Sequence, residues 1–120
     1  MIIANCLFEA RMPAVYVKHY LTSEGLDYFK TYWFAEVNSI ISRQNGFVSI
    51  VYAVQKNSDC VDIILKFKDD PSLDAWLAVP DHDDLIQSLD RYRSRDYFEA
   101  ARSRSEDVYH VEWVKYPVGK

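Results

Sequence analysis

Residues 47–67 read FVSIVYAVQKNSDCVDIILKF, and this stretch decides the fold of the chain. Its two ends, 47–55 and 61–67, are rich in β-branched and aromatic residues, which is the composition of strands. The polar segment KNSDC between them suits the turn of a hairpin. The stretch therefore predicts two antiparallel strands joined by a short loop.

A strand and a helix are expected before this hairpin. Residues 14–21 (AVYVKHYL) alternate between two faces, which is a strand pattern. TSEG follows, with Thr22 or Ser23 as the N-cap of a helix. Apolar residues then recur at helical spacing until Asn45-Gly46, where the helix should end. The apolar stripe consists of Leu26, Phe29, Trp33, Val37, Ile40 and Ile41.

Helical segments are expected after the hairpin. In DDPSLDAWLAV, Asp70 is the expected N-cap and Pro71 the first helical residue. Pro80 interrupts this helix. In DHDDLIQSLDRYR the helix restarts with Asp81 as its cap. The apolar stripes of the two pieces consist of Leu73, Trp76 and Leu77, and of Leu85, Leu89 and Tyr92.

The end of the chain completes the element order. Residues 94–105 are expected to continue as a bent or separate helical segment. Residues 107–116 (DVYHVEWVKY) alternate again and predict a closing strand. The order is then strand, helix, strand, strand, helix, strand. This is the α+β, ferredoxin-like βαββαβ plan with an antiparallel sheet.

In this plan the helices cover only one face of the sheet. The other face carries apolar residues into water, and an open apolar face of that size usually marks an interface. The simplest closure is a homodimer with the two sheets packed face to face, a dimeric α+β barrel. Six residues are expected to bury apolar area on one face or the other: Val48, Ile50, Ile63, Leu65, Val111 and Trp113.

Length and composition narrow the class of protein. The chain has 120 residues, which suits one domain, assigned to 14–120 after an N-terminal extension, 1–13. Its net charge of −4 argues against a nucleic-acid partner. No apolar run approaches the roughly 20 residues of a membrane span, and the start lacks a basic leader. A cytoplasmic protein without a membrane partner is therefore expected.

Metal and cofactor motifs are missing from the sequence. The two cysteines, Cys6 and Cys60, make neither a disulfide framework nor a zinc site. The three histidines are scattered, and three glycines form no phosphate-binding loop. We therefore expect no metal site and no bound cofactor.

Several motifs together carry a family resemblance over about residues 14–116. They are VYVKHYLTSEGLDYF, NGFVSIVY, VDIILKFKDDPSLDAWL, and a PDH break followed by a further helix. In these motifs the chain resembles the antibiotic-biosynthesis-monooxygenase-like group of dimeric α+β barrels. That group includes cofactor-independent quinone-forming oxygenases and haem-degrading enzymes. The resemblance implies oxygen chemistry on an aromatic substrate without a bound cofactor. The alternative is a non-catalytic small-molecule-binding or stress-associated barrel.

The haem-degrading branch of this group offers a separate comparison. Trp76 stands where that branch has a tryptophan that ruffles the haem. The branch also has a histidine ligand about ten residues later, where this chain has Ile86, and the nearest histidine is His82. An asparagine marks its first strand, where Lys18 and His19 stand here. Because two of three marks are missing, we expect no stoichiometric haem binding.

Two histidines are the candidate catalytic residues. His19 shares a strand face with Val15 and Val17, so it points with apolar residues. It either lines a cavity and accepts a proton, or is a buried histidine bonded to a backbone carbonyl. His82 lies among aspartates in the first turn of a helix. It is either an acid–base group or a solvated surface histidine.

Three aromatic residues are the candidate substrate-binding residues. Trp76 either stacks on a flat substrate or belongs to the core through its helical stripe. Tyr52 and Tyr92 either form cavity walls or are ordinary core residues. The enzyme hypothesis uses Tyr52 and Trp76 to position the rings of the substrate.

Charged residues near the C-terminus allow two further hypotheses. His110 and Glu112 have the same parity, so they form either a catalytic pair or an exposed ion pair. Five arginines stand among balancing acids, which predicts a solvated ion-paired face. One of these arginines can anchor an acidic substrate. The five are Arg91, Arg93, Arg95, Arg102 and Arg104.

Overall fold

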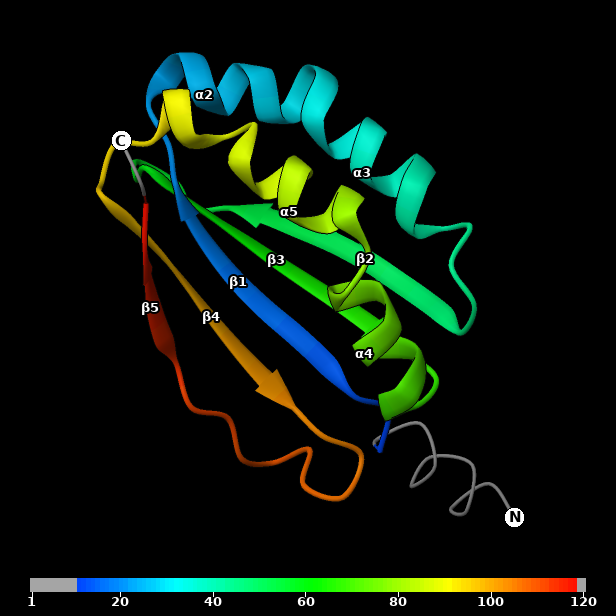
Figure 1. Cartoon of the computed structure of the whole chain (residues 1–120). Helices are drawn as coiled ribbons and strands as arrows, with labels where there is room; N and C mark the ends of the chain where they lie inside the picture. Colours follow the sequence, from blue (N-terminus) through cyan, green and yellow to red (C-terminus); the bar gives the residue numbers. More distant parts are fainter. Residues whose placement is uncertain (1–10, 119–120) are drawn as a thin grey trace.

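The computed structural model describes residues 11–118, which form one antiparallel sheet with helices on one face (Figure 1). The strands lie in the order β2-β3-β1-β4-β5. They are β1 (Ala14–Tyr20), β2 (Phe47–Val54), β3 (Cys60–Phe67), β4 (Tyr97–Ser103) and β5 (Val114–Pro117). The helices are α2 (Ser23–Tyr28), α3 (Phe34–Ile41), α4 (Asp70–Leu77) and α5 (Pro80–Gln87). A π-helical segment, η1 (Phe29–Trp33), joins α2 to α3, and a 3-10 turn, η2 (Asp90–Tyr92), follows α5. The predicted α+β, ferredoxin-like fold is confirmed.

The hairpin and the first helix follow the sequence prediction closely. β2 and β3 pair antiparallel, and β3 also pairs antiparallel with β1. Thr22 is the N-cap of α2, and its hydroxyl accepts from the backbone N–H of Gly25 at 3.1 Å. The predicted long helix is continuous in direction but contains the π-helical segment η1.

The prediction for the end of the chain is wrong in two places. Residues 97–103 form strand β4 and not a helix, and of the last strand expected over 107–116 only 114–116 is a strand, within β5 (Val114–Pro117). The segment YFEAARS contains good helix formers and no β-branched residue, so its local preference is helical. Pairing with β1 on one side and β5 on the other overrides this preference.

Two helix starts differ from the predicted caps. Asp69, and not Asp70, caps α4, because its carboxylate accepts from the backbone N–H of Ser72 at 2.8 Å. Pro80 begins α5 as its first residue, and Asp81 is not its cap. A proline suits this position because the first helical N–H has no partner within the helix. The break between α4 and α5 is therefore a change of direction at Val79 and Pro80.

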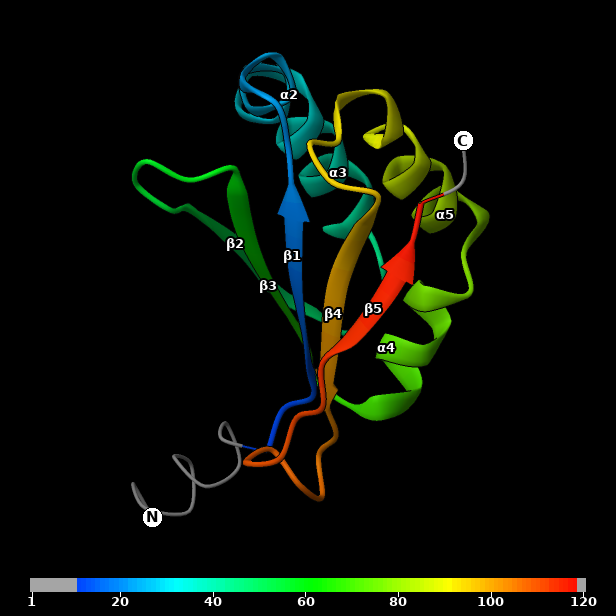
Figure 2. The same cartoon turned by 90° about the vertical axis from the view of Figure 1, so that its left-hand side faces the viewer.

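The two faces of the sheet have different roles. Figure 2 shows the helices packed on one face, and no helix of residues 11–118 lies on the other. On β1 and β3 the odd-numbered residues face the helices and form the core with Phe29, Trp33, Leu73, Trp76 and Leu89. The even-numbered residues of both strands face the opposite side, which we call the outer sheet face. Of the six strand residues expected to be buried, Ile63 and Leu65 belong to the core, Ile50 is half-buried against it, and Val48, Val111 and Trp113 are exposed.

Other features concern the described part of the chain. None of its helices has the length and apolar character needed to cross a membrane. Cys60 is buried and forms no disulfide, and Cys6 lies outside the described residues. The predicted N-terminal extension also lies largely outside them, since the description begins at Arg11.

Candidate functional site

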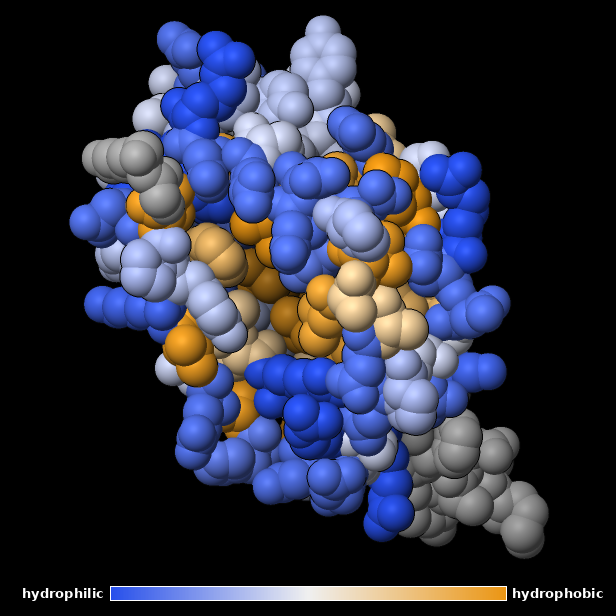
Figure 3. Space-filling view, viewed as in Figure 1, coloured by the Kyte–Doolittle hydropathy of each residue, from blue (hydrophilic) through white to orange (hydrophobic). Residues whose placement is uncertain are grey.

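A large cavity lies between the helix-facing side of the sheet and helices α4 and α5. Its volume is about 1180 Å³, and β1, β3, β4 and β5 line it from the sheet side. Figure 3 shows apolar side chains at the floor of the hollow and hydrophilic side chains around its rim. An apolar cavity with a few polar groups is the usual form of a small-molecule site. The question is which polar groups converge on it.

His19 lines the cavity from β1, on the same face as Val15 and Val17. Its side chain is almost fully buried, with an exposed fraction of 1%. Trp33 meets the imidazole edge-on at 5.9 Å, and Phe98 lies 5.3 Å away on the other side. The predicted shared face is confirmed, and the cavity position is the one that a functional His19 requires.

The partner of His19 is an arginine rather than a backbone carbonyl. Arg93 Nη1 lies 3.0 Å from His19 Nδ1. A guanidinium has only donors, so Nδ1 must be the unprotonated nitrogen and Nε2 must carry the ring proton. Burial and the charge of Arg93 lower the pKa of His19 from 6.5 to about 3. His19 is therefore neutral at physiological pH and offers a donor, which disfavours a role as proton acceptor.

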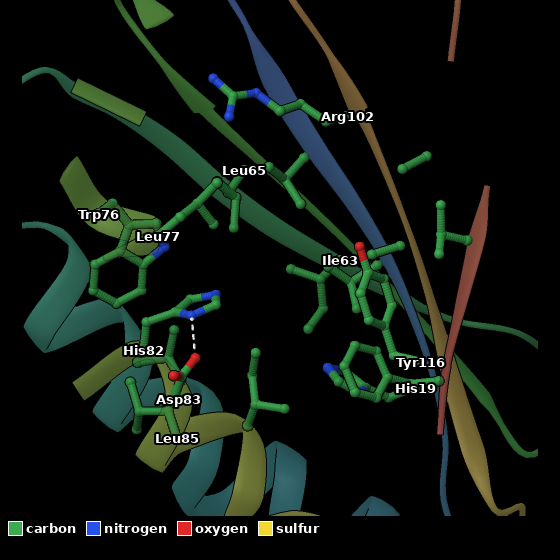
Figure 4. A pocket seen from close by; sticks show the side chains of 18 of the residues that line it. His19, Ile63, Leu65, Trp76, Leu77, His82, Asp83, Leu85, Arg102 and Tyr116 are labelled. Carbon is green, nitrogen blue, oxygen red and sulfur yellow. Dashed lines mark hydrogen bonds and ion pairs between the residues drawn. The ribbon is translucent and has the colours of Figure 1, made fainter. Parts of the chain in front are cut away.

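Trp76 and His82 line the cavity from the helix side, opposite His19 (Figure 4). Their rings meet edge-on at 5.5 Å, because the turn at Pro80 directs His82 back toward Trp76. His82 Nδ1 lies 3.2 Å from Asp83 Oδ1. A carboxylate only accepts, so the contact favours the neutral tautomer in which Nδ1 carries the proton and Nε2 has the lone pair. His82 is thus the histidine of this cavity that is suited to accept a proton.

Arg102, one of the five arginines considered as an anchor for an acidic substrate, lines the cavity from β4. Its Nη1 donates to Asp74 Oδ1 at 2.7 Å, and its Nη2 lies 3.6 Å from Asp70 Oδ1. In the described structure, the buried Nε and Nη2 of Arg102 have no hydrogen-bond partner, and neither does Trp76 Nε1. Buried donors without partners are rare in proteins. Both residues line the cavity, while these three atoms are themselves buried, so an acceptor from the cavity reaches them only if the side chains of the wall shift.

The other predicted site residues lie apart from this cluster. Tyr52 packs against Phe29 and Phe34, with ring centroids at 5.1 and 4.6 Å, and does not line the cavity. Tyr92 stacks on Tyr28 at 4.8 Å and is likewise outside the cavity lining. Both tyrosines therefore pack against aromatic residues of the helical layer and lie outside the residues that line the cavity.

The His110–Glu112 pair stands at the rim of the cavity. His110 Nε2 lies 3.3 Å from Glu112 Oε1, and both side chains are mostly exposed. They belong to the loop before β5 and not to a strand. Among the described residues, no group of three or more histidine, cysteine or acidic side chains is arranged to hold a metal ion.

Trp33 and Trp76 form a matched pair that tests the unpartnered donor. Trp33 Nε1 donates to the Leu85 carbonyl at 2.8 Å and to Ser88 Oγ at 2.9 Å, whereas Trp76 Nε1 has no partner. Trp33→Phe should lower the free energy of unfolding by about 1–3 kcal/mol more than Trp76→Phe. Urea denaturation of both variants measures this difference. Equal losses would mean that Trp76 Nε1 is satisfied in solution.

Comparison with known proteins gives structural but not sequence matches. No protein-family model matches the chain, and no curated protein matches it. A single-residue mutant of SnoaB, a cofactor-independent oxygenase from Streptomyces nogalater, matches with 16% identity and a TM-score of 0.65, covering 78% of this chain and 91% of that one.

Two further solved structures have the same architecture. A conserved protein from Methanosarcina mazei Go1 matches with 13% identity and a TM-score of 0.63, covering 93% of this chain and 98% of that one. An antibiotic biosynthesis monooxygenase matches with 12% identity and a TM-score of 0.60, covering 91% of this chain and 100% of that one. At such identities the likeness concerns the fold alone: the chain has the fold of the antibiotic biosynthesis monooxygenase structures, as its sequence predicts.

Proposed function

We propose that this protein is a small-molecule enzyme that oxygenates an electron-rich polycyclic phenol without a bound cofactor. One observation carries the proposal: Trp76 and Arg102 line a large apolar cavity, and each has a buried donor without a partner among the described residues, just behind the cavity surface. They suit an oxygen atom on a flat hydrophobic ligand. The likeness in fold to a cofactor-independent oxygenase supports the reaction type.

The spacing of the polar groups fits a ligand of several fused rings. Arg102 pairs with Val15 in the register between β1 and β4. His19 lies four residues further along β1, which is about 13 Å at 3.3 Å per residue. A polycyclic ligand with an oxygen at each end spans such a distance. The two ends of the cavity then bind two oxygens of one substrate.

The proposed reaction is balanced without an external reductant. Removing a proton from a ring CH₂ group that is conjugated with a carbonyl through the aromatic rings gives a carbanion, which transfers an electron to O₂. The resulting pair recombines through a new C–O bond to a hydroperoxide, and loss of water leaves a carbonyl. In total, CH₂ and O₂ become C=O and H₂O, and the substrate supplies all the electrons.

Each polar residue of the cavity has its own role in the proposed reaction. His82 accepts the proton at Nε2, with Asp83 holding the ring through Nδ1. Arg102 and Trp76 donate to the oxygen on which negative charge develops. His19 donates to the second oxygen, which differs from the role as proton acceptor that its sequence position suggests. The apolar walls keep water from the carbanion.

We also propose that a second copy of the chain packs against the outer sheet face and forms a homodimer. Across that face, the strand register aligns Val51, Ile64, Tyr16 and Ala101 in one apolar row. Val51 is 55% exposed, and none of the described helices covers this row (Figure 2). Lys18 and Asp62 flank it with opposite charges, as a two-fold symmetric contact needs.

Oxygen uptake with dithranol, a dihydroxylated anthrone, tests the proposed reaction. The wild type should consume O₂ and form the anthraquinone faster than the spontaneous reaction does. His82→Asn should lower kcat by about a hundredfold or more, through loss of the proton acceptor. Arg102→Met should raise KM by about 10- to 100-fold, whereas Arg43→Met, in the turn after α3, should change neither constant.

The alternatives give different results in the same assay. Binding of dithranol without added oxygen uptake would make the protein a small-molecule binder. One haem per chain, with a Soret band that His82→Ala removes and His19→Ala keeps, would make it a haem-binding protein. Absence of both binding and uptake would overturn the proposal for this class of ligand.

A further inference from the structure

We propose that Arg93 makes the inner end of the cavity selective for a hydrogen-bond-accepting oxygen, because it holds His19 in the form that presents only an N–H to a ligand. Arg93 is a positioning residue in this account, since it acts through His19. The inference rests on the proposed function, because it assigns a specificity to one end of the same cavity.

Arg93 is fixed by contacts along its whole guanidinium group. Nη1 contacts His19 Nδ1 at 3.0 Å, Nε donates to Asp90 Oδ1 at 2.8 Å, and Nη2 donates to the carbonyl oxygen of Ile86 at 3.2 Å. The guanidinium carbon lies 4.9 Å from the centre of the Phe98 ring. Only 2% of the side chain is exposed. An arginine held in this way cannot turn aside to let Nδ1 take a proton.

Among the described residues around His19, no side chain offers an acceptor that would favour the tautomer protonated at Nδ1. Trp33 from η1 and Phe98 from β4 are uncharged neighbours of the ring. Among the charged and titratable side chains of the cavity on this side, Asp90 is bound by Arg93, and Tyr116 reaches in from β5. Figure 4 places Tyr116 beside His19. Nε2 has no hydrogen-bond partner among the described residues, so its proton is available to a ligand.

The chemical consequence is a preference between ligands of equal shape. A carbonyl or phenolate oxygen accepts the Nε2 proton, whereas a CH₂ group in the same place leaves a buried donor unpaired. Fluorenone and fluorene are flat tricycles that differ only in this respect. Loss of one neutral hydrogen bond corresponds to about a three- to tenfold change in affinity.

The experiment combines nitrogen NMR with binding of this ligand pair. In the wild type at neutral pH, the side-chain ¹⁵N signals should show His19 protonated at Nε2 and His82 protonated at Nδ1. Fluorenone, but not fluorene, should shift the His19 Nε2–H signal. The ratio of the two affinities should fall three- to tenfold in His19→Asn, whose amide oxygen can still accept from Arg93.

Two substitutions of Arg93 separate positioning from folding. Arg93→Met removes the donors and should lower the affinity ratio as His19→Asn does, while Arg93→Lys keeps a donor beside Nδ1 and should restore most of it. If Arg93→Met does not fold, the tautomer of His19 in the wild type still tests the inference. A His19 protonated at Nδ1, or a ratio unchanged in His19→Asn, would overturn the inference and leave the proposed function standing. Failure of both ligands to bind the wild type would instead count against the proposed function.

Discussion

Ile63→Asp is expected to prevent folding, whereas Ile64→Asp should give a folded subunit that no longer forms a dimer. The two residues are neighbours on β3, and successive residues of a strand point to opposite faces. Ile63 is 3% exposed and belongs to the core beneath the helices. Ile64 is half-buried on the outer sheet face, between Tyr16 and Val51.

The size of the first effect follows from burial of an unpaired charge. A carboxylate in the core without a partner costs at least about 4–5 kcal/mol, which is a large part of a typical folding free energy of 5–15 kcal/mol. At position 64 the carboxylate reaches water in the single subunit. In the proposed dimer it would face its own copy across the two-fold axis.

Sedimentation and circular dichroism of both variants check this prediction. The wild type should sediment as a dimer at micromolar concentration, and Ile64→Asp as a folded monomer. A wild type that is monomeric would contradict the proposed dimer. Tolerance of both substitutions, with folding and association intact, would contradict the assignment of the two faces of β3.

Acidification should destabilise the protein through His19 well before its carboxylates are protonated. The folded state keeps His19 neutral down to its lowered pKa of about 3, whereas in the unfolded chain it binds a proton below about 6.5. The stabilising effect of neutral burial is therefore complete above pH 6.5 and is lost as the pH falls toward 3. The loss amounts to about 1.4 kcal/mol per pH unit in this window, or about 2 kcal/mol at pH 5.

His19→Asn is the matched control for the acid effect. Its amide oxygen can accept from Arg93, but it has no group that titrates in this range. Urea denaturation between pH 7.5 and 4.5 should show a steeper loss of stability in the wild type than in the variant. Parallel curves would mean that His19 takes up its proton in the folded state at an ordinary pKa.

The order of elements could be predicted because most strands and helices carry a clear local signal. The hairpin of 47–67 and the alternation of 14–21 both show β-branched residues with period two. β4 has no such signal, since its alternate residues include alanines, a glutamate and an arginine. Its strand conformation depends on pairing with two other strands. β1 lies far from it in the sequence, and β5 follows it.

The candidate site was predicted in part for the same reason. His19 was placed on the correct face because β1 alternates, and Trp76 and His82 were found as neighbours within a short segment. Arg102 could not be distinguished from the four other arginines, because its segment was expected to be helical. The alternation Phe98, Ala100, Arg102 would have directed it into the cavity if β4 had been recognised.

The partners of the site residues could not be predicted from sequence. Arg93 is 74 residues from His19 in the chain and meets it only in the folded structure. This contact reverses the expected role of His19 from acceptor to donor. No local pattern indicates such a contact, because it arises where the turn after η2 crosses the end of β1.

The central claim is that a flat ligand binds in the cavity with an oxygen on the donors of Trp76 and Arg102. The three tryptophans of the chain allow a direct test by indole ¹⁵N–¹H spectra, because their surroundings differ. Trp76 Nε1 is buried without a partner behind the cavity surface, Trp33 Nε1 is bonded within the wall, and Trp113 lies near Lys18 of the outer sheet face.

Titration with the anthraquinone product of dithranol is the deciding measurement. The account predicts a saturable shift of the Trp76 indole signal at one ligand per chain, with the Trp113 signal unchanged and the Trp76 shift lost in Arg102→Met. A ligand that binds and shifts Trp113 but leaves Trp76 unmoved, or no saturable shift at all, would contradict it.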